Sequence, residues 1–139
     1  EKSVGLMLKE EERFGIKKLK TYKDFGTKVY KIRDNVRRNI RKLKDKNKLV
    51  VGYGAPAKAT TALNFFGISS EINYIIEDNK MKHNKFIPGV QIPIKTKSNL
   101  KSKNNVLIVL AWNFFKDIKK NNLNLSDNII NIKDLEINK

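Results

Sequence analysis

The sequence predicts an α/β fold in which a mostly parallel sheet of four or five strands forms the middle of three layers. Apolar runs without polar interruption occur at residues 49–51, 72–76 and 106–111, and they alternate with segments of helical period. Unbroken apolar runs are typical of strands buried on both faces, and their alternation with helices is typical of a parallel sheet. The first run also leads directly into a glycine-rich turn.

Residues 1–47 are predicted to form a helical extension with one long helix. Gly15 is a natural end for a first short helix. Apolar residues at alternating steps of three and four then predict a helix of about 25 residues that begins near Thr21. The members of this apolar stripe are Tyr22, Phe25, Val29, Ile32, Val36, Ile40 and Leu43.

Residues 48–139 are predicted to form the α/β domain. Strong strands alternate here with helices, and a polar stretch between residues 79 and 85 separates the second strand from a weaker edge segment. Gly67 is expected to end the first helix. The expected elements, in order, are a strand at 49–51, a helix at 56–66, strands at 72–76, 90–94 and 106–111, a helix ending near 120, and a strand at 129–132.

The formal net charge of +16 is concentrated before the first strand, because residues 16–48 carry 14 basic and 3 acidic side chains. A basic helix can bind the phosphates of nucleic acid. However, the basic residues fall off the apolar stripe, as expected of a solvated helix face. Only 5 of the 30 basic residues are Arg, and no zinc finger, basic zipper or aromatic–basic RNA-binding pattern occurs. Nucleic-acid binding is therefore kept as the less favoured alternative.

The composition excludes several kinds of site. The chain has no Cys, which excludes a Cys-ligated zinc site, and its one His, His83, disfavours a His-built metal site or a Ser–His triad. His83 lies in a polar stretch and is expected to be exposed. No apolar run approaches the roughly 18 residues of a membrane span, and no apolar leader is visible. We expect a cytoplasmic protein without membrane contact and, because it begins at Glu1, part of a longer chain.

A glycine-rich turn at residues 52–57, Gly-Tyr-Gly-Ala-Pro-Ala, matches the pattern G-x-G-x-x-[G/A] between a strand and a helix. In this pattern Gly52 allows a tight turn, Gly54 lets a phosphate approach the backbone, and Ala57 permits close helix packing. The free N–H groups at the helix start can bind an anion. Tyr53 could face that ligand or pack inside. The turn predicts a Rossmann-like nucleotide site, and a dinucleotide-binding module of NAD type is one alternative.

Four side chains near the expected carboxyl edge of the sheet carry the rest of the site. Lys58 could pair with a ligand phosphate, which we favour, or cap its own helix. Asp78 could accept a ribose or sugar hydroxyl or bridge locally to Lys82, and both interpretations stay open. Trp112 and Asn113 follow a strand at the edge where open α/β sheets bind ligands, although Trp112 could equally be a core or interdomain residue.

Taken together, several separated motifs resemble the C-terminal domain of the SAM-dependent sugar C-methyltransferases. That family methylates a carbon of a nucleotide-linked keto-deoxysugar. The similarity runs almost from end to end and is sharpest at residues 52–58, with departures at Asn84, where glycine is usual, and at Glu77, an additional acid. The other matching residues are Ser3-Val4, Gly15, Tyr22 to Phe25, Thr61, Leu63, Asn64, Gly67-Ile68, Asp78-Asn79, Lys82, Lys85-Phe86, Pro88-Gly89, Ile92 to Ile94 and Leu107 to Asn113.

The resemblance implies a three-domain enzyme in which Cys residues of an N-terminal part bind zinc and a middle part binds SAM. The family's catalytic His and Tyr lie in that middle part, so we expect no catalytic residue in this chain and no activity of the chain alone. The expected partners are a nucleotide-sugar substrate and the upstream SAM-binding domain. The expected substrate-binding residues are Gly52, Tyr53, Gly54, Ala55, Pro56, Lys58, Asp78, Lys82, Trp112 and Asn113.

Overall fold

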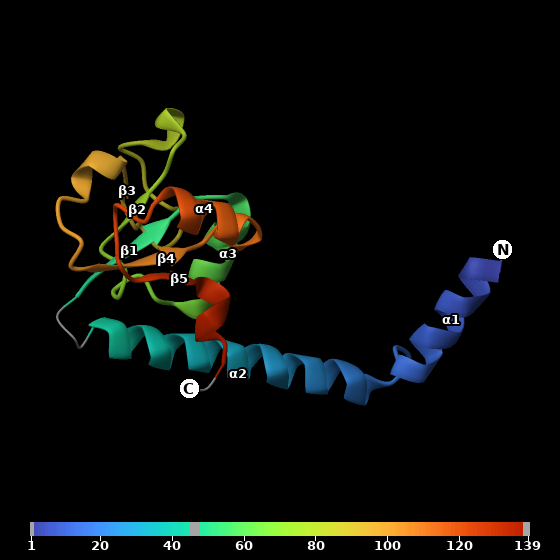
Figure 1. The fold of residues 1–139 in the computed structure, drawn as a ribbon. Coiled ribbons are helices and arrows are strands. Elements are labelled where there is room, and N and C mark those ends of the chain that lie inside the picture. Colours follow the sequence, from blue (N-terminus) through green and yellow to red (C-terminus); the bar gives the residue numbers. More distant parts are fainter. Residues whose placement is uncertain (1, 45–47, 138–139) are drawn as a thin grey trace. The chain divides into compact units, whose positions relative to one another are not determined.

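The structure, a computed structural model, describes residues 2–44 and 48–137 (Figure 1). Its contacts divide the chain into two compact units, with the boundary between Ile32 and Arg33. This boundary lies inside a continuous helix, Leu19–Lys44. The end of that helix, from Arg33 onward, therefore belongs to the larger unit. The predicted domain boundary between residues 47 and 48 stays a prediction.

The first unit contains helix α1 (Lys2–Phe14) and the beginning of helix α2 (Leu19–Lys44). Gly15 ends α1 as predicted, with φ of +77° and an N–H that donates to the carbonyl of Glu11 at 3.0 Å. α2 has 26 residues, close to the predicted length. The large apolar side chains that lie more than half exposed in this unit are Val4, Leu6, Met7, Leu8, Phe14, Leu19, Tyr22, Phe25 and Tyr30.

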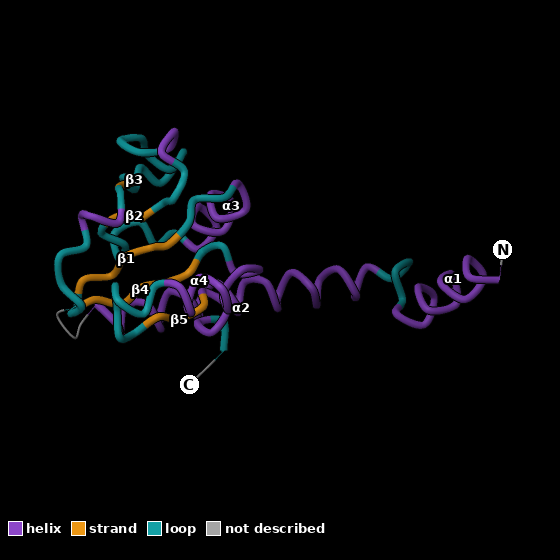
Figure 2. Tube along the Cα trace, turned by 45° about the horizontal axis from the view of Figure 1, so that its top comes forward, coloured by secondary structure: helices purple, strands orange, loops and turns teal. Residues whose placement is uncertain are grey.

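The second unit is built around a five-stranded sheet in which every strand pair is parallel. From β1 the chain moves outward to β2 and β3, then crosses back to β4 and β5 on the other side of β1 (Figure 2). The order β3-β2-β1-β4-β5 confirms the predicted α/β fold and makes the gap between β1 and β4 the topological switch point. The strands are β1 (Leu49–Tyr53), β2 (Tyr74–Ile76), β3 (Ile94–Lys95), β4 (Asn105–Val109) and β5 (Ile129–Asn131).

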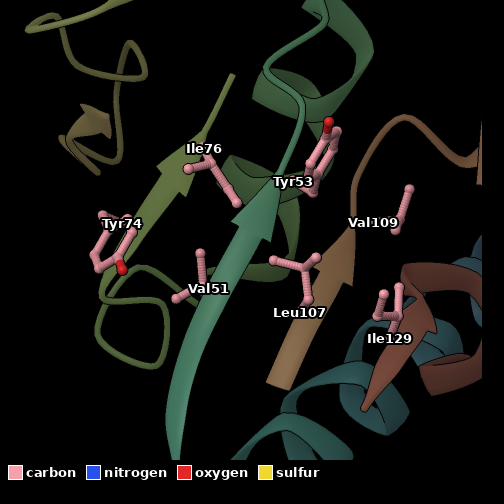
Figure 3. Packing of buried hydrophobic residues seen from close by; sticks show 7 residues of the cluster. All are labelled: Val51, Tyr53, Tyr74, Ile76, Leu107, Val109 and Ile129. Atoms are coloured by element: carbon pink, nitrogen blue, oxygen red, sulfur yellow. The ribbon is translucent and has the colours of Figure 1, made fainter. Parts of the chain in front are cut away.

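One face of the sheet carries a buried cluster that runs across four strands (Figure 3). Phe115 and Ile118 of helix α4 (Phe115–Asn121) pack against this cluster, as do partly buried residues of the connecting loops. Its members are Val51, Tyr53, Tyr74, Ile76, Leu107, Val109 and Ile129. Val50, Gly52 and Ile75 alternate with these residues and so point to the opposite face.

The last part of α2 is attached to the α/β domain by buried apolar side chains and by polar ties. Val36 and Ile40 are fully buried, and burial of each side chain contributes about 1.5–3 kcal/mol. Asn35 Nδ2 donates to the carbonyl of Glu136 at 2.8 Å. Arg37 Nε donates to the carbonyl of Phe66, the last residue of helix α3 (Ala57–Phe66). The predicted apolar stripe of α2 is therefore buried at its end, while its start remains exposed.

The turn after β1 begins later in the structure than the sequence suggests. Gly52 lies inside β1, paired with Ile75, and not in the turn. A Cβ at this position would lie 2.8 Å from Ile75 Cγ1 and 3.0 Å from Leu110 Cδ1. Glycine is therefore required here by close packing on the second face of the sheet. The expectation that Gly52 makes the tight turn is wrong, and the turn starts only at Gly54.

Candidate ligand-binding site

The turn after β1 is held tightly between the two neighbouring strands. Gly54 has φ of +85°, and its N–H donates to the carbonyl of Ile76 at 2.8 Å. A Cβ on Gly54 would lie 3.1 Å from the Cβ of Ala111, just after β4. Pro56, with φ of −72°, precedes the first residue of α3, and no side chain caps this helix. The positive φ and the contact with Ala111 explain the glycine without any ligand.

An acid from the end of β2 occupies this turn. Glu77 Oε2 accepts a hydrogen bond from the Ala55 N–H at 2.7 Å, and Glu77 Oε1 accepts one from the Asn79 N–H at 3.0 Å. Lys82 Nζ donates to the Ala55 carbonyl at 2.9 Å and lies 3.5 Å from Glu77 Oε2. Burial acts to raise the pKa of Glu77, but these N–H groups and Lys82 outweigh it and hold the pKa below 4.5. The Ala55 N–H is therefore already bonded to an anion of the chain itself.

A second acid–lysine group lies beside the first. Tyr53 Oη donates to Asp78 Oδ2 at 2.7 Å, and Lys97 Nζ lies 2.8 Å from Asp78 Oδ1. Burial acts to raise the pKa of Asp78, but the hydrogen bonds from Lys97 and Tyr53 lower it further than burial raises it. Burial raises the pKa of the Tyr53 phenol above 10.0. The Asp78 side chain is 62% exposed, so its carboxylate stays accessible to a ligand hydroxyl.

The structure differs from the sequence interpretation at two local points. Of the two open interpretations of Asp78, the bridge to Lys82 is not formed, because Glu77 makes that contact and Asp78 pairs with Lys97 instead. His83 is only partly exposed, since its Nε2 lies 2.7 Å from the carbonyl oxygen of Glu77. Both differences arise because the loop after β2 folds back over the strand end. This brings side chains onto the turn that sequence spacing does not place there.

A cationic aromatic cluster lies on the other side of β1, where β4 ends. Lys58 Nζ is 4.1 Å from the centroid of the Trp112 ring, and Lys133 Nζ is 5.8 Å from the same centroid. Trp112 is partly exposed and therefore not a core residue, and Asn113 beside it is exposed. The side chain of Lys58 lies on the Trp112 ring, and no side-chain hydrogen bond is made at the N-cap of α3. The end of β1 thus separates two groups of side chains, one with paired acids and one with lysines on an indole ring.

The predicted site residues therefore divide between two groups. Three further candidate residues were not predicted from the sequence. Tyr53, Ala55, Asp78 and Lys82 belong to the acid–lysine group, whereas Lys58 and Trp112 belong to the aromatic group. The candidates that were missed are Glu77, Lys97 and Lys133. Glu77 is the first residue after β2, which is a usable sequence clue. Lys97 and Lys133 are distant in sequence, so only the fold brings them here.

The basic helix face contributes to a different feature. A surface hollow of about 530 Å³ is lined by Asp34, Arg37, Arg38, Arg41 and Lys42 of α2, outside the carboxyl edge of the sheet. Two of these cations are already bonded within the chain. Arg37 donates to the Phe66 carbonyl, and Arg41 Nε lies 3.3 Å from Glu71 Oε1. Part of this basic face therefore secures the helix to the domain.

Neither a metal cluster nor a membrane helix occurs in the part of the chain that the structure describes. Within residues 2–44 and 48–137, no three His, Cys, Asp or Glu side chains are grouped so that they could hold a metal ion. Among the same residues, no helix has the length and apolar character needed to cross a membrane.

Comparison with known proteins identifies the family to which the chain belongs. The family described as "C-methyltransferase C-terminal domain" matches residues 1–130. The chain is also 30% identical over 128 residues to C-methyltransferase NovU from Streptomyces niveus. That alignment covers 91% of this chain and 30% of NovU, so the chain spans under a third of the relative's length.

Proposed function

The chain belongs to the C-methyltransferase C-terminal domain family, and on this premise we propose that it is the substrate-binding domain of a SAM-dependent C-methyltransferase acting on a nucleotide-linked deoxysugar. The match over residues 1–130 carries the assignment to C-methylation. The sugar-nucleotide part of the proposal is supported by the side chains at the carboxyl edge of β1 and β4. This edge is where open α/β sheets bind their ligands.

The chemistry of that edge suits the three parts of a nucleotide-linked sugar. The exposed Asp78 carboxylate can accept hydrogen bonds from sugar or ribose hydroxyls, and Tyr53 and Lys97 hold it ionised and oriented. Lys58 supplies positive charge for phosphate. Trp112 presents an aromatic surface, which can pack against a base or sugar. These residues bind and orient the ligand, and none is proposed to react with it.

Methyl transfer itself is assigned to the part of the enzyme that lies upstream. SAM supplies the methyl group and is proposed to bind in an upstream domain of the same longer chain. Zinc is likewise assigned upstream, because this chain has no Cys and its one His is engaged with the Glu77 carbonyl. We propose that the 139-residue chain alone is inactive, and that the full enzyme works in the cytoplasm.

The upstream SAM-binding domain is also the proposed partner of the first unit. Nine large apolar side chains lie more than half exposed on α1 and the beginning of α2. Exposed large apolar side chains in such number suit an interface better than a surface in water. The relative NovU is much longer than the chain, which covers 30% of it, so a further domain is available in a protein of that kind.

A ligand panel tests the proposal against its main alternative. The sheet order and the glycine turn also suit a dinucleotide-binding module of NAD type. We expect at least one sugar linked to dTDP, UDP, GDP or CDP to raise the Tm by roughly 9 °C near a hundredfold excess over its Kd. NAD(H) should give no shift. Stabilisation by NAD(H) without any response to the sugar nucleotides would favour the alternative. Methyl transfer by the chain alone, with SAM and the same sugars, would refute the proposed inactivity.

A nucleic-acid partner stays the least favoured function. It would use the basic side of α2, where Arg37 and Arg41 are already engaged by the Phe66 carbonyl and by Glu71. Passage of the chain over immobilised DNA and RNA at about 0.15 M salt tests this function. We expect no retention, and salt-sensitive retention would revive it.

A further inference from the structure

The two side-chain groups described at the carboxyl edge of the sheet include four lysines that differ in one respect. Lys82 and Lys97 are paired with Glu77 and Asp78, at 3.5 Å and 2.8 Å. Lys58 and Lys133 both lie over Trp112, and within residues 2–44 and 48–137 neither forms an ion pair with a carboxylate. Positive charge is therefore balanced on the β2 side of β1 and unbalanced on the β4 side.

The glycine turn itself is a poor place for a phosphate in this chain. Its Ala55 N–H is bonded to the Glu77 carboxylate at 2.7 Å, and the pKa of Glu77 is held below 4.5 despite its burial. A phosphate placed on that N–H would have to displace a carboxylate that is ionised at neutral pH. Two anions at one donor repel each other strongly at short distance. The pyrophosphate of a ligand should therefore lie away from Ala55.

We infer that Lys58 and Lys133 form a pair that binds the diphosphate of a nucleotide-linked ligand at the gap between β1 and β4, with Trp112 as its floor. The inference rests on the proposed function and identifies both the binding group and a residue, Lys133, that the sequence motifs do not include. Lys58 comes from α3, just after β1, whereas Lys133 follows β5, so the pair spans the topological switch point.

The chemistry of the cluster fits a diphosphate better than a neutral ligand. Two ammonium groups near one ring repel each other, and an anion with two charged phosphoryl groups would relieve that repulsion. The ring attracts each ammonium group modestly, by about 0.5–1 kcal/mol at exposed sites, so both lysines can turn toward an anion at little cost. Trp112 is the one Trp of the sequence, so its fluorescence reports on this cluster alone.

The test uses the 139-residue chain and two probes. Inorganic pyrophosphate is titrated while Trp112 fluorescence is excited at a wavelength where tyrosine does not absorb. dTDP-glucose is titrated by calorimetry. The variants are Lys58→Met and Lys133→Met, with Lys101→Met as the matched control. Lys101 is exposed in the loop before β4, at the opposite edge of the sheet, and its substitution changes the net charge equally. Circular dichroism verifies that each variant is folded.

We expect pyrophosphate to change the Trp112 fluorescence saturably. Lys58→Met and Lys133→Met should each lower the affinity for both probes about tenfold or more. Lys101→Met should change the affinity less than about twofold. The inference is overturned if dTDP-glucose binds the Lys133→Met variant as tightly as the parent chain, or if Lys101→Met weakens binding equally. In the first of these cases the proposed function survives. Lysine-dependent binding of pyrophosphate without any sugar-nucleotide binding would support the pair and contradict the proposed function. Absence of binding by both probes would overturn the inference, and the proposed function would fall with it if no sugar nucleotide of the panel binds.

Discussion

The Glu77 carboxylate accepts a hydrogen bond from the Ala55 N–H at 2.7 Å, so an acid from the end of β2 is bonded to the turn that follows β1. The same carboxylate accepts from Asn79, and Lys82 lies between it and the Ala55 carbonyl. This contact disfavours a phosphate at the Ala55 N–H. It is the reason why we infer that the phosphates bind at the lysines on Trp112.

Replacing Glu77 should therefore change stability in a pH-dependent way. Because its pKa in the folded chain is below 4.5, ionised Glu77 stabilises the fold above that pH and loses its contribution as the pH falls through the lowered value. Glu77→Gln should lower the free energy of unfolding by about 1 kcal/mol near neutral pH. The variant should also lose less stability than the parent chain between about pH 6 and about pH 3. Urea unfolding at several pH values measures both effects, and an identical pH dependence would contradict this role.

Tyr53→Phe tests the second acid–lysine group. The phenol donates to Asp78 at 2.7 Å, and its removal should cost about 0.5–1 kcal/mol, because water can replace it at the exposed carboxylate. Burial raises the pKa of Tyr53 above 10.0, so the neutral phenol contributes stability that is lost as the pH rises through the raised value. In an ultraviolet titration, the variant should show one fewer tyrosine that ionises at high pH than the parent chain. Loss of an ordinary, early-ionising tyrosine would show that Tyr53 is not buried as described.

Replacement by alanine should lower the stability at one glycine, Gly54, and raise it at another, Gly26. Gly54→Ala places a Cβ 3.1 Å from Ala111 at a φ of +85°, and should destabilise the domain by about 1–3 kcal/mol. Gly26 lies in the interior of α2, and a Cβ added there would meet no atom within 4 Å, so Gly26→Ala should add helix stability of about 0.5–1 kcal/mol. Thermal unfolding followed by circular dichroism compares the two. A Gly54→Ala variant as stable as the parent would contradict the geometry of the turn.

The polar tie between α2 and the end of the chain supports a further prediction. Asn35 is buried and donates to the Glu136 carbonyl at 2.8 Å. Asn35→Ala leaves that carbonyl without its donor and should lower the free energy of unfolding by about 1–3 kcal/mol. Asn124→Ala, at an exposed position, is the control and should change it by less than about 0.5 kcal/mol. Equal effects of the two substitutions would show that the tie does not stabilise the domain.

Local patterns in the sequence were sufficient for most elements of this fold. Unbroken apolar runs predicted the central strands, and Gly67 ended α3 in the left-handed conformation, with φ of +60°. Asn84 also adopts a left-handed φ of 58°, a conformation that Asn tolerates better than most residues other than glycine. The resemblance motifs at Asn64 and Pro88 meet in space, since Asn64 Nδ2 donates to the Pro88 carbonyl at 2.9 Å. These features depend on neighbours in sequence or on backbone conformation.

Features that depend on distant contacts were not predictable in the same way. The role of Gly52 follows from its close approach to Ile75 and Leu110, which sequence spacing does not reveal. Glu77 was noted only as an additional acid, because its contact with the Ala55 N–H depends on where β2 ends, which sequence spacing does not fix to one residue. Lys133 lies near Trp112 only because β5 ends beside β4 in the sheet.

The most direct measurement of the central claim is a map of backbone and indole NMR shifts during titration with the sugar nucleotide that gives the largest Tm rise in the panel. If the chain is the substrate-binding domain proposed here, shifts should concentrate at residues 53–58, at Asp78 and at the Trp112 indole N–H. The exposed apolar helix α1 should stay unshifted. Saturable shifts confined to α1 and α2, or binding without any change at Trp112 and residues 53–58, would contradict the proposed site.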